Sequence, residues 1–438
     1  MPDLLIQNGH LIDPSSADAP RDLLIRDGRV AAIDLPGAFN HLAHADQIDA
    51  TNLTIAPGLI DLHVHLREPG QTHKETIATG TRAAAAGGFT AVVAMPNTTP
   101  VNDSAALTRW MLDPARDAAV NLFAMPAATL GSLGEALTDF AALRDAGAVG
   151  FTDDGKPILH DRIMRSALVA AARVGLPVSQ HAEDTRLTAG CSMNAGPLSF
   201  RLGLRGMTVE AESEIVRRDL ALLREIERTE HLRPHLHVQH VSTARALTAI
   251  REAKCQGLHV TCEVAPHHFT LTEEAVANYD TNAKMNPPLR SEADRQAVIE
   301  ALLDGTVDAI ATDHAPHTRD EKEVEFERAP NGITGLETAL GLALRVLHRQ
   351  HGMPLTRIIA LMSSNPARFL PPGHGTLTPG SPADLILFDP AADWTYIAQN
   401  SLSKSKNSPF HGTPMLGKIH RTILGGRTIF TAESTPRT

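Results

Sequence analysis

The sequence contains little cysteine, with only Cys191, Cys255 and Cys262 among 438 residues. None of the three belongs to a C-x-x-C pair, and an odd number of cysteines is typical of a reducing compartment. The first residues, Met-Pro-Asp-Leu-Leu-Ile, lack the basic and apolar regions of a signal peptide. We therefore expect a cytoplasmic protein.

Long hydrophobic runs and blocks of basic charge are also missing. No apolar run approaches the ~20 residues that a membrane-spanning helix needs. The net charge is −10 without any basic block, which argues against nucleic acid as a partner. Hydrophobic residues nevertheless make up 42% of the chain, so we expect a globular protein with two domains. A small anionic substrate stays possible, because a local arginine or metal cluster can bind one.

Both ends of the chain have the pattern of short β-strands. Asn8-Gly9 and Asp27-Gly28 each separate two apolar runs, which predicts two hairpins. A third hairpin is predicted within residues 422–430. We expect residues 1–55 and 366–438 to combine into one β-sandwich domain.

Between these ends, short apolar runs alternate with segments of helical composition. The runs are 59–64, 89–95, 120–126, 147–152, 176–181, 236–240, 258–264 and 307–312. The helical segments are 75–87, 104–118, 131–146, 160–174, 208–230, 243–256 and 291–304. Eight alternations over roughly 300 residues fit a (β/α)8 barrel better than the alternative, an open parallel sheet. The barrel is expected to occupy residues 56–365.

Residues that bind metals follow several of these runs. They are His63 and His65 after the first run, Asp153 and Asp154 after the fourth, His181 after the fifth, His240 after the sixth and Asp313 after the eighth. Residues two apart on a strand share a face, so His63 and His65 point the same way. Because the carboxyl ends of barrel strands meet at one face, we expect these side chains to converge there. Neighbouring strand residues face opposite sides, so only one of Asp153 and Asp154 points inward.

The set indicates a two-metal hydrolase. Four imidazoles and two carboxylates can hold two cations such as Zn²⁺, with one carboxylate between them. Two metals about 3.5–4 Å apart can share a hydroxide and polarise a carbonyl. A neighbouring carboxylate can pass the hydroxide proton to a leaving nitrogen. Taken singly, a histidine such as His181 or His240 is more often a buried structural residue than a ligand, and Asp313 can cap the segment that follows it.

Five motifs carry a family resemblance over nearly the whole chain. They are Asp61-Leu-His-Val-His-Leu-Arg-Glu-Pro-Gly70, Met95-Pro-Asn-Thr98, Phe151-Thr-Asp-Asp-Gly155, Lys284-Met-Asn-Pro-Pro-Leu-Arg290 and Ala311-Thr-Asp-His-Ala-Pro-His317. Together they resemble the amidohydrolase superfamily and, within it, the dihydroorotase family of the longer bacterial type. The resemblance implies reversible hydrolysis of the cyclic amide of (S)-dihydroorotate to N-carbamoyl-L-aspartate in pyrimidine biosynthesis. It further implies two Zn²⁺ ions per chain and attack by a metal-bridging hydroxide.

The resemblance also assigns roles to individual residues. It places His63 and His65 on one metal, His181 and His240 on the other, Asp154 between them, and Asp313 as metal ligand and proton shuttle. The substrate contacts that it implies are Arg67, Asn97, Asn286, His317 and the backbone at Asn331 and Gly332. A homo-oligomer, or association with an aspartate transcarbamoylase, is compatible with this family.

Several alternatives stay open at this point. Hydantoinases and allantoinases hydrolyse similar rings, and many such relatives have a carboxylated lysine where this chain has its Asp pair. An inactive barrel that serves as a structural partner of aspartate transcarbamoylase is a further possibility. The segment 314–335 is either a mobile loop over the site or an exposed turn. His267 and His268 either line the site or are structural, and His231, His235 and His237 are expected near a strand start, away from it.

Overall fold

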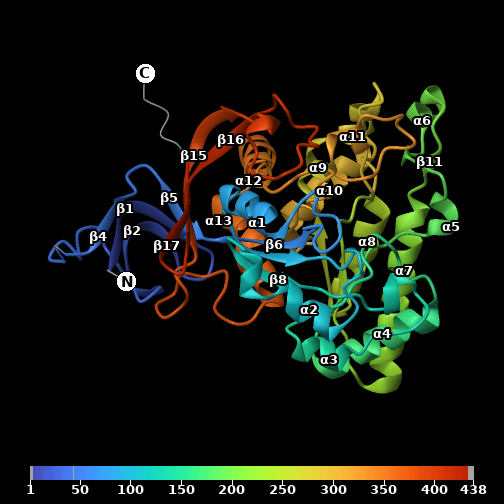
Figure 1. Cartoon of the computed structure of the whole chain (residues 1–438), viewed down its shortest axis with the longest axis horizontal. Helices are drawn as coiled ribbons and strands as arrows, with labels where there is room; N and C mark the ends of the chain where they lie inside the picture. The colour runs from blue at the N-terminus through green and yellow to red at the C-terminus, as the bar shows by residue number, and fades with distance from the viewer. Residues whose placement is uncertain (1–2, 43, 433–438) are drawn as a thin grey trace.

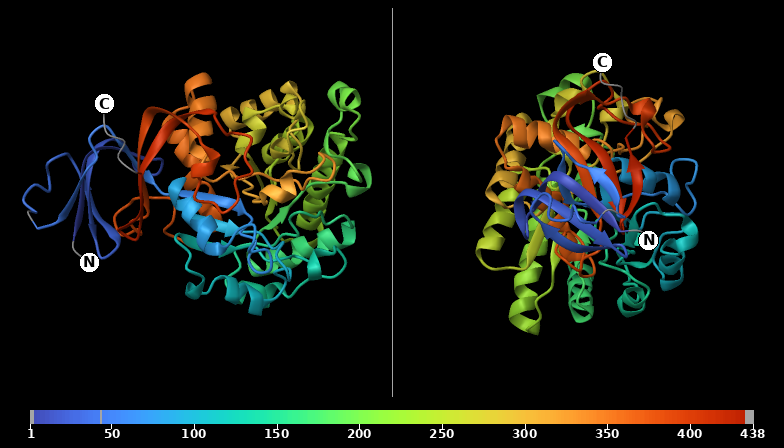
Figure 2. Two further views of the ribbon diagram at one scale, coloured as in Figure 1. Left: turned by 45° about the horizontal axis from the view of Figure 1, so that its top comes forward. Right: turned by 90° about the vertical axis from the view of Figure 1, so that its left-hand side faces the viewer.

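The computed structural model describes residues 3–42 and 44–432. Residues 434–438, for which the sequence predicts a loose tail, lie outside the described residues. The chain forms the predicted (β/α)8 barrel beside a β unit built from both chain ends (Figure 1). The views in Figure 2 show the first strands, in blue, lying against the last strands, in red, on one side of the barrel.

A single sheet joins the two ends of the chain. Its order is β17-β16-β15-β5-β1-β2-β3, and β4 pairs with β1. The strands are β1 (Leu4–Asp13), β2 (Ala17–Arg26), β3 (Arg29–Asp34), β4 (Asp46–Asp49), β5 (Thr54–Pro57), β15 (Leu385–Thr395), β16 (Pro414–Leu424) and β17 (Arg427–Thr431). Ile6, Leu23, Leu385 and Ile423 pack into one buried cluster, so the sheet curls around a core of its own. The description of this unit as a sandwich, with limits at 55 and 366, stays a prediction.

Two of the three predicted hairpins are present. Strands β2 and β3 are antiparallel and meet at Asp27-Gly28, where both residues have positive φ angles, and β16 and β17 meet at Gly425-Gly426. The hairpin predicted at Asn8-Gly9 is wrong. Strand β1 continues through this dipeptide as a bulge with φ 64° at Asn8, and the Asn8 amide donates to Asp22 Oδ1 at 2.9 Å. The long pairing with β2 therefore outweighs the local turn preference.

All eight predicted runs contribute to the barrel wall. Seven are regular strands: β6 (Leu59–Val64), β7 (Phe89–Ala94), β8 (Asn121–Ala124), β9 (Val178–Gln180), β12 (Leu236–Val238), β13 (Val260–Val264) and β14 (Ala309–Ile310). The fourth run is irregular, and its residues 148–151 form isolated bridges with β8 on one side and β9 on the other. A bridge between Val64 and His314 closes the ring between its first and last strands.

Helices cover the outside of the barrel. They are α1 (Ile77–Ala86), α2 (Ala105–Met111), α3 (Phe140–Asp145), α4 (Asp161–Val174), α7 (Glu210–Glu230), α8 (Ala244–Cys255), α10 (Glu292–Asp304), α12 (Ala339–Ala343) and α13 (Leu355–Ile359). Two predicted helices are shorter than expected. The segment 104–118 stops being α-helical at Met111, ahead of Pro114. The segment 131–146 becomes α-helical only at Phe140, after a short 3-10 turn at Leu130–Ser132, because Gly131 and Gly134 adopt positive φ angles.

Strand β15 connects the β unit to the barrel. Leu385 and Leu387 belong to the core of the β unit, whereas Ile386 and Phe388 belong to the barrel core, as the two-residue strand period requires. All four side chains are fully buried. Burying a side chain of this size stabilises a fold by about 1.5–3 kcal/mol. Within the described part of the chain, no helix is both long enough and apolar enough to span a membrane.

Candidate two-metal centre and substrate pocket

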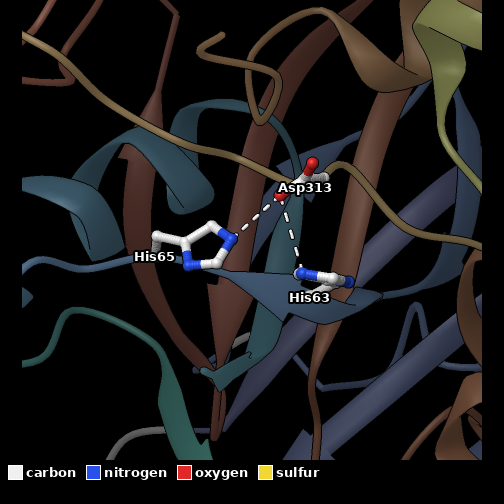
Figure 3. Close-up of side chains that lie close together, drawn as sticks. All are labelled: His63, His65 and Asp313. Atoms are coloured by element: carbon white, nitrogen blue, oxygen red, sulfur yellow. Dashed lines mark hydrogen bonds and ion pairs between the residues drawn. The ribbon is translucent and has the colours of Figure 1, made fainter. Parts of the chain in front are cut away.

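The first group of candidate metal ligands lies where the barrel closes. His63 is the second-last residue of β6, His65 directly follows that strand, and Asp313 comes three residues after β14. Figure 3 shows the three side chains close together. Asp313 Oδ1 lies 2.9 Å from His65 Nε2 and 3.5 Å from His63 Nε2. The buried carboxylate of Asp61 holds the two strands together, because it accepts hydrogen bonds from the backbone amides of His63 (3.0 Å) and Thr312 (3.1 Å). The three side chains are close enough to bind one ion.

The second group lies beside the first and shares a carboxylate with it. Asp154 Oδ1 is 3.3 Å from His63 Nε2, 3.6 Å from His181 Nδ1 and 3.7 Å from His240 Nε2, whereas its Oδ2 is 3.5 Å from His65 Nε2. Asp154 thus faces imidazoles of both groups. Asp153 instead accepts hydrogen bonds from the backbone and hydroxyl of Thr129. Of the two neighbouring aspartates, Asp154 is the one that points to the centre.

The polar atoms in this centre fit divalent cations. His63 Nε2 and Asp154 Oδ1 are buried without a hydrogen-bond partner, and such atoms are costly unless they bind something. His181 Nδ1 and His240 Nε2 face each other at 2.9 Å. An imidazole and carboxylate donor set suits Zn²⁺, Mn²⁺ or Co²⁺. The residues present therefore match a two-metal site.

The electrostatics of the centre favour positive charge in its middle. Burial alone lowers the pKa of His63, but Asp154 and Asp313 outweigh it and raise this pKa well above its usual value. The same balance of burial against nearby carboxylates raises the pKa of His181 to about 10. Burial raises the pKa of Asp154, yet the surrounding imidazoles lower it well below its usual range. The carboxylates are thus ionised, and protons and metal ions compete for the imidazoles.

Two carboxylates that were not predicted from the sequence, the buried Glu263 and the partly buried Glu183, support these imidazoles. Glu263, in β13, lies 2.7 Å from His63 Nδ1, and Glu183 lies 2.9 Å from His181 Nε2. The expectation that His237 lies away from the site is wrong, because its Nε2 is 3.1 Å from Glu263 Oε2. A signal was available for both: Glu263 is a lone charge inside an apolar run, and Glu183 follows His181 by two residues. A buried charge of this kind requires a partner.

The residues expected to bind the substrate carboxylate lie next to the metal-binding groups. The buried Arg67 donates from Nε to the Pro316 carbonyl at 3.2 Å, and its Nη2 lies 3.3 Å from His317 Nε2. His317 Nε2 is also 2.9 Å from the Asn331 carbonyl oxygen. At Gly332, a Cβ atom would come within 2.6 Å of Ala315 Cβ, so glycine is required there.

The protonation states of Arg67 and His317 follow from burial and from nearby charges. Burial lowers the pKa of Arg67 to about 10, so its guanidinium stays cationic at neutral pH. Burial, together with the nearby Arg67 and Lys74, lowers the pKa of His317 to about 2, so its ring is neutral. A fixed cation beside a neutral hydrogen-bonding ring is well suited to a substrate carboxylate.

The two predicted asparagines complete the network. Asn97 Oδ1 lies 2.8 Å from His65 Nδ1, and Asn286 Nδ2 donates to Glu183 Oε2 at 2.8 Å. The structure thus brings all the predicted site residues into one connected region. Of the two further histidines, His267 is buried, and His268 Nε2 lies 3.1 Å from the Pro287 carbonyl, next to Asn286.

Buried lysines hold the segment 314–335 against the barrel. Lys284 Nζ donates to the carbonyls of Phe326 (2.8 Å) and Ala329 (2.7 Å). Lys322, at the end of α11 (Arg319–Lys322), donates to the carbonyls of Thr281 (2.9 Å) and Pro330 (2.8 Å). The segment is therefore anchored at several points, and its movement over the site stays a prediction.

Comparison with known proteins agrees with this geometry. Residues 53–245 match a family model described as dihydro-orotase-like. The dihydroorotase of Desulforapulum autotrophicum is 47% identical over 428 residues, covering 98% of this chain and 99% of that protein. The dihydroorotase of Geobacter metallireducens is 48% identical over 429 residues, with the same coverage of 98% and 99%.

A solved structure supports the fold assignment. The L-hydantoinase (dihydropyrimidinase) from Arthrobacter aurescens superposes with a TM-score of 0.85 at 26% identity, covering 98% of this chain and 96% of that chain. The sequence identity to the two dihydroorotases, 47% and 48%, is much higher than the 26% identity to this hydantoinase, and the alignment covers nearly the entire length of both dihydroorotases. The chain belongs to the dihydroorotase family of cyclic amidohydrolases.

Proposed function

We propose that the protein reversibly hydrolyses the cyclic amide of (S)-dihydroorotate to N-carbamoyl-L-aspartate in pyrimidine biosynthesis. The observation that carries this proposal is the position of Asp154 among four imidazoles, with the buried pair Arg67 and His317 beside them. An aspartate at this position, with no lysine before it at the end of the fourth run, favours dihydroorotate over the substrates of hydantoinases. The names of the full-length relatives support the same reaction.

Two Zn²⁺ ions are the proposed cofactors. His63, His65 and Asp313 would hold one ion, His181 and His240 the other, and Asp154 both. When bound, such ions lower the pKa of a water molecule to near neutrality and polarise a carbonyl oxygen. The four carboxylates Asp154, Asp313, Glu183 and Glu263 carry as much negative charge as two divalent cations carry positive charge.

Asp313 is the proposed proton carrier. Burial raises its pKa, but His63 and His65 lower it below its usual range, so the carboxylate is ionised and can accept a proton. The oxygen of the attacking water forms a bond to the ring carbonyl carbon, and the water proton passes to Asp313. The bond between that carbon and the ring nitrogen then breaks. Asp313 returns the proton to the departing nitrogen, which becomes the terminal NH₂ of the carbamoyl group.

The remaining pocket residues orient the ring. Arg67, Asn97 and His317 bind the substrate carboxylate, and the backbone at Asn331 and Gly332 closes the pocket beside them. The amide nitrogen of Asn286 already donates to Glu183, so its oxygen is left to accept a ring N–H. Holding the carboxylate in this way fixes the reacting carbonyl in place, which is a large part of catalysis by positioning.

The catalytic reaction is proposed to reside in residues 56–365, with residues 1–55 and 366–438 as a supporting β domain, in a cytoplasmic protein. The sheet that joins β5 to β15 supports this division. Self-association, and association with an aspartate transcarbamoylase, are further parts of the proposal. Size-exclusion chromatography with light scattering tests both, with and without that enzyme.

The decisive experiment combines metal analysis with an activity assay on the purified protein. The loss of dihydroorotate is followed by its ultraviolet absorbance, with hydantoin and allantoin as control substrates. We expect two metal ions per chain and selective turnover of dihydroorotate. Turnover of a control substrate alone would assign the protein to the other cyclic amidohydrolases, and neither metal nor turnover would indicate an inactive structural partner.

A further inference from the structure

Each proposed metal position contains one imidazole whose second nitrogen contacts a carboxylate, the buried Glu263 in one case and the partly buried Glu183 in the other. His63 Nδ1 lies 2.7 Å from Glu263 Oε1, and His181 Nε2 lies 2.9 Å from Glu183 Oε2. The other imidazole of each position has no such partner. His65 Nδ1 lies 2.8 Å from the neutral Asn97 Oδ1, and His240 Nδ1 is buried without a hydrogen-bond partner.

These contacts fix the tautomers of the two paired rings in opposite ways. A metal-binding imidazole keeps a single hydrogen, and a carboxylate accepts hydrogen bonds. In that form the hydrogen of His63 lies on Nδ1 and its lone pair on Nε2, which faces Asp154 at 3.3 Å. The hydrogen of His181 lies on Nε2, and its lone pair on Nδ1 faces Asp154 at 3.6 Å. A carboxylate behind an imidazole also makes the ring a stronger donor toward a metal.

The two carboxylates act in separate surroundings. Glu263 lies inside the barrel wall and accepts a second hydrogen bond from His237 Nε2 at 3.1 Å. Glu183 lies in the loop after β9 and accepts hydrogen bonds from the Thr188 hydroxyl and from Asn286 Nδ2, the latter at 2.8 Å. Glu263 thus contacts other barrel residues, whereas Glu183 contacts a residue proposed to read the substrate ring.

We propose that Glu263 and Glu183 are positioning residues that set the metal affinities of the two positions separately, and that Glu183 also links its position to substrate binding through Asn286. The inference rests on the two-metal centre proposed above. Loss of a carboxylate behind a metal-binding histidine typically costs about 10- to 100-fold in metal affinity. We expect Glu263→Gln to have this effect on the position of His63 and His65, and Glu183→Gln on that of His181 and His240.

The test measures each position in isolation. His240→Ala removes a ligand from the position of His181 and His240 and leaves the position of His63 and His65 intact. His65→Ala does the reverse. The Zn²⁺ dissociation constant is measured by competition with a chromophoric chelator, before and after each glutamate is replaced in each background. Glu263→Gln should weaken the remaining ion only in the His240→Ala protein, and Glu183→Gln only in the His65→Ala protein.

Glu212→Gln is the matched control. Glu212 is also a buried carboxylate near the end of β12, but it accepts hydrogen bonds from Ser242 and Thr243 and contacts no imidazole of the centre. Its replacement removes a buried charge, and it should leave Zn²⁺ affinity unchanged in both backgrounds. The second readout is KM for dihydroorotate at saturating Zn²⁺, which should rise in Glu183→Gln and stay unchanged in Glu263→Gln.

A third measurement does not depend on the variants being folded. Long-range ¹H–¹⁵N NMR of the otherwise unaltered protein, loaded with Zn²⁺, should show Nδ1–H on His63 and Nε2–H on His181, and the opposite tautomers would overturn the proposal. The proposal would also be overturned if either glutamate variant lowered the Zn²⁺ affinity of both positions equally, or if neither variant lowered the Zn²⁺ affinity of any position. If the protein itself binds fewer than two Zn²⁺ ions, the failure lies with the two-metal function.

Discussion

Replacing Arg67 by lysine separates the shape of this side chain from its charge. Arg67 is buried, and its Nε is anchored on the Pro316 carbonyl at 3.2 Å, so that its terminal nitrogens lie beside His317. A guanidinium can donate two parallel hydrogen bonds to a carboxylate, whereas an ammonium acts as a single point charge. Arg67→Lys therefore keeps the positive charge and removes both the anchor and the paired donors.

The expected loss is that of one hydrogen bond to a charged group. Such a bond contributes about 1.5–3 kcal/mol. At 1.36 kcal/mol per factor of ten, KM for dihydroorotate should rise about 10- to 150-fold. The carboxylate is remote from the bond that breaks, and binding it helps the ground state and the transition state alike. The value of kcat should therefore change little.

The assay compares dihydroorotate with 5,6-dihydrouracil, which has the same ring without the carboxylate. The substitution should increase KM for dihydroorotate and leave the reaction of dihydrouracil nearly unaffected. Arg319→Lys is the control, because the Arg319 side chain is 83% exposed and, within residues 3–42 and 44–432, forms an ion pair with Glu323 alone. An equal penalty on both substrates, or an unchanged KM for dihydroorotate, would refute the carboxylate-binding role of Arg67.

Three further predictions concern the chemistry, the metals and the core. Asp313→Asn should lower kcat by about 10²- to 10⁴-fold with an unchanged circular dichroism spectrum, and a near-normal rate would exclude it as the proton carrier. Chelation should abolish activity and Zn²⁺ should restore it. The pKa of His181 is raised to about 10, so below that pH a Zn²⁺ ion must displace a proton from this imidazole. The Zn²⁺ affinity, measured by chelator competition, should therefore rise from pH 6 to 9. Phe151 is fully buried and stacks on Phe140 with ring centroids 3.9 Å apart. Phe151→Ala should therefore reduce the free energy of unfolding, measured in urea, by about 3–5 kcal/mol. A loss below about 1 kcal/mol would contradict that packing.

The barrel and the main site residues could be predicted from the order of strands and helices and from the residues that follow each strand. Parallel strands present their carboxyl ends at one face, so His63, His181 and Asp313 meet there whatever the details of packing. The choice between Asp153 and Asp154 could not be made from the strand period, because either residue can face inward. It depends on the irregular fourth strand, where Thr129 holds Asp153 away from the centre.

The features that were missed depend on which strands are neighbours and on competing pairings. The partner of Glu263 is His63, 200 residues earlier in the chain, and no local pattern connects the two. Asn8-Gly9 has the composition of a hairpin turn, but β1 pairs with β2 on both sides of it, and the sum of those pairings decides the conformation. The predicted helix at 131–146 failed over its first half for a local reason, namely the positive φ angles of Gly131 and Gly134.

Closure of the barrel has a consequence for the order of events during synthesis. The backbone amide of His65 donates to the His314 carbonyl at 2.8 Å, beside the contact of His65 with Asp313. A nascent chain that ends before Asp313 therefore has neither a closed ring nor a complete first metal position. Contacts between residues so distant in sequence form late in folding. We therefore expect metal uptake at this position to follow release of the last barrel strand from the ribosome. Local opening between β6 and β14 in the mature protein would be a route for metal loss.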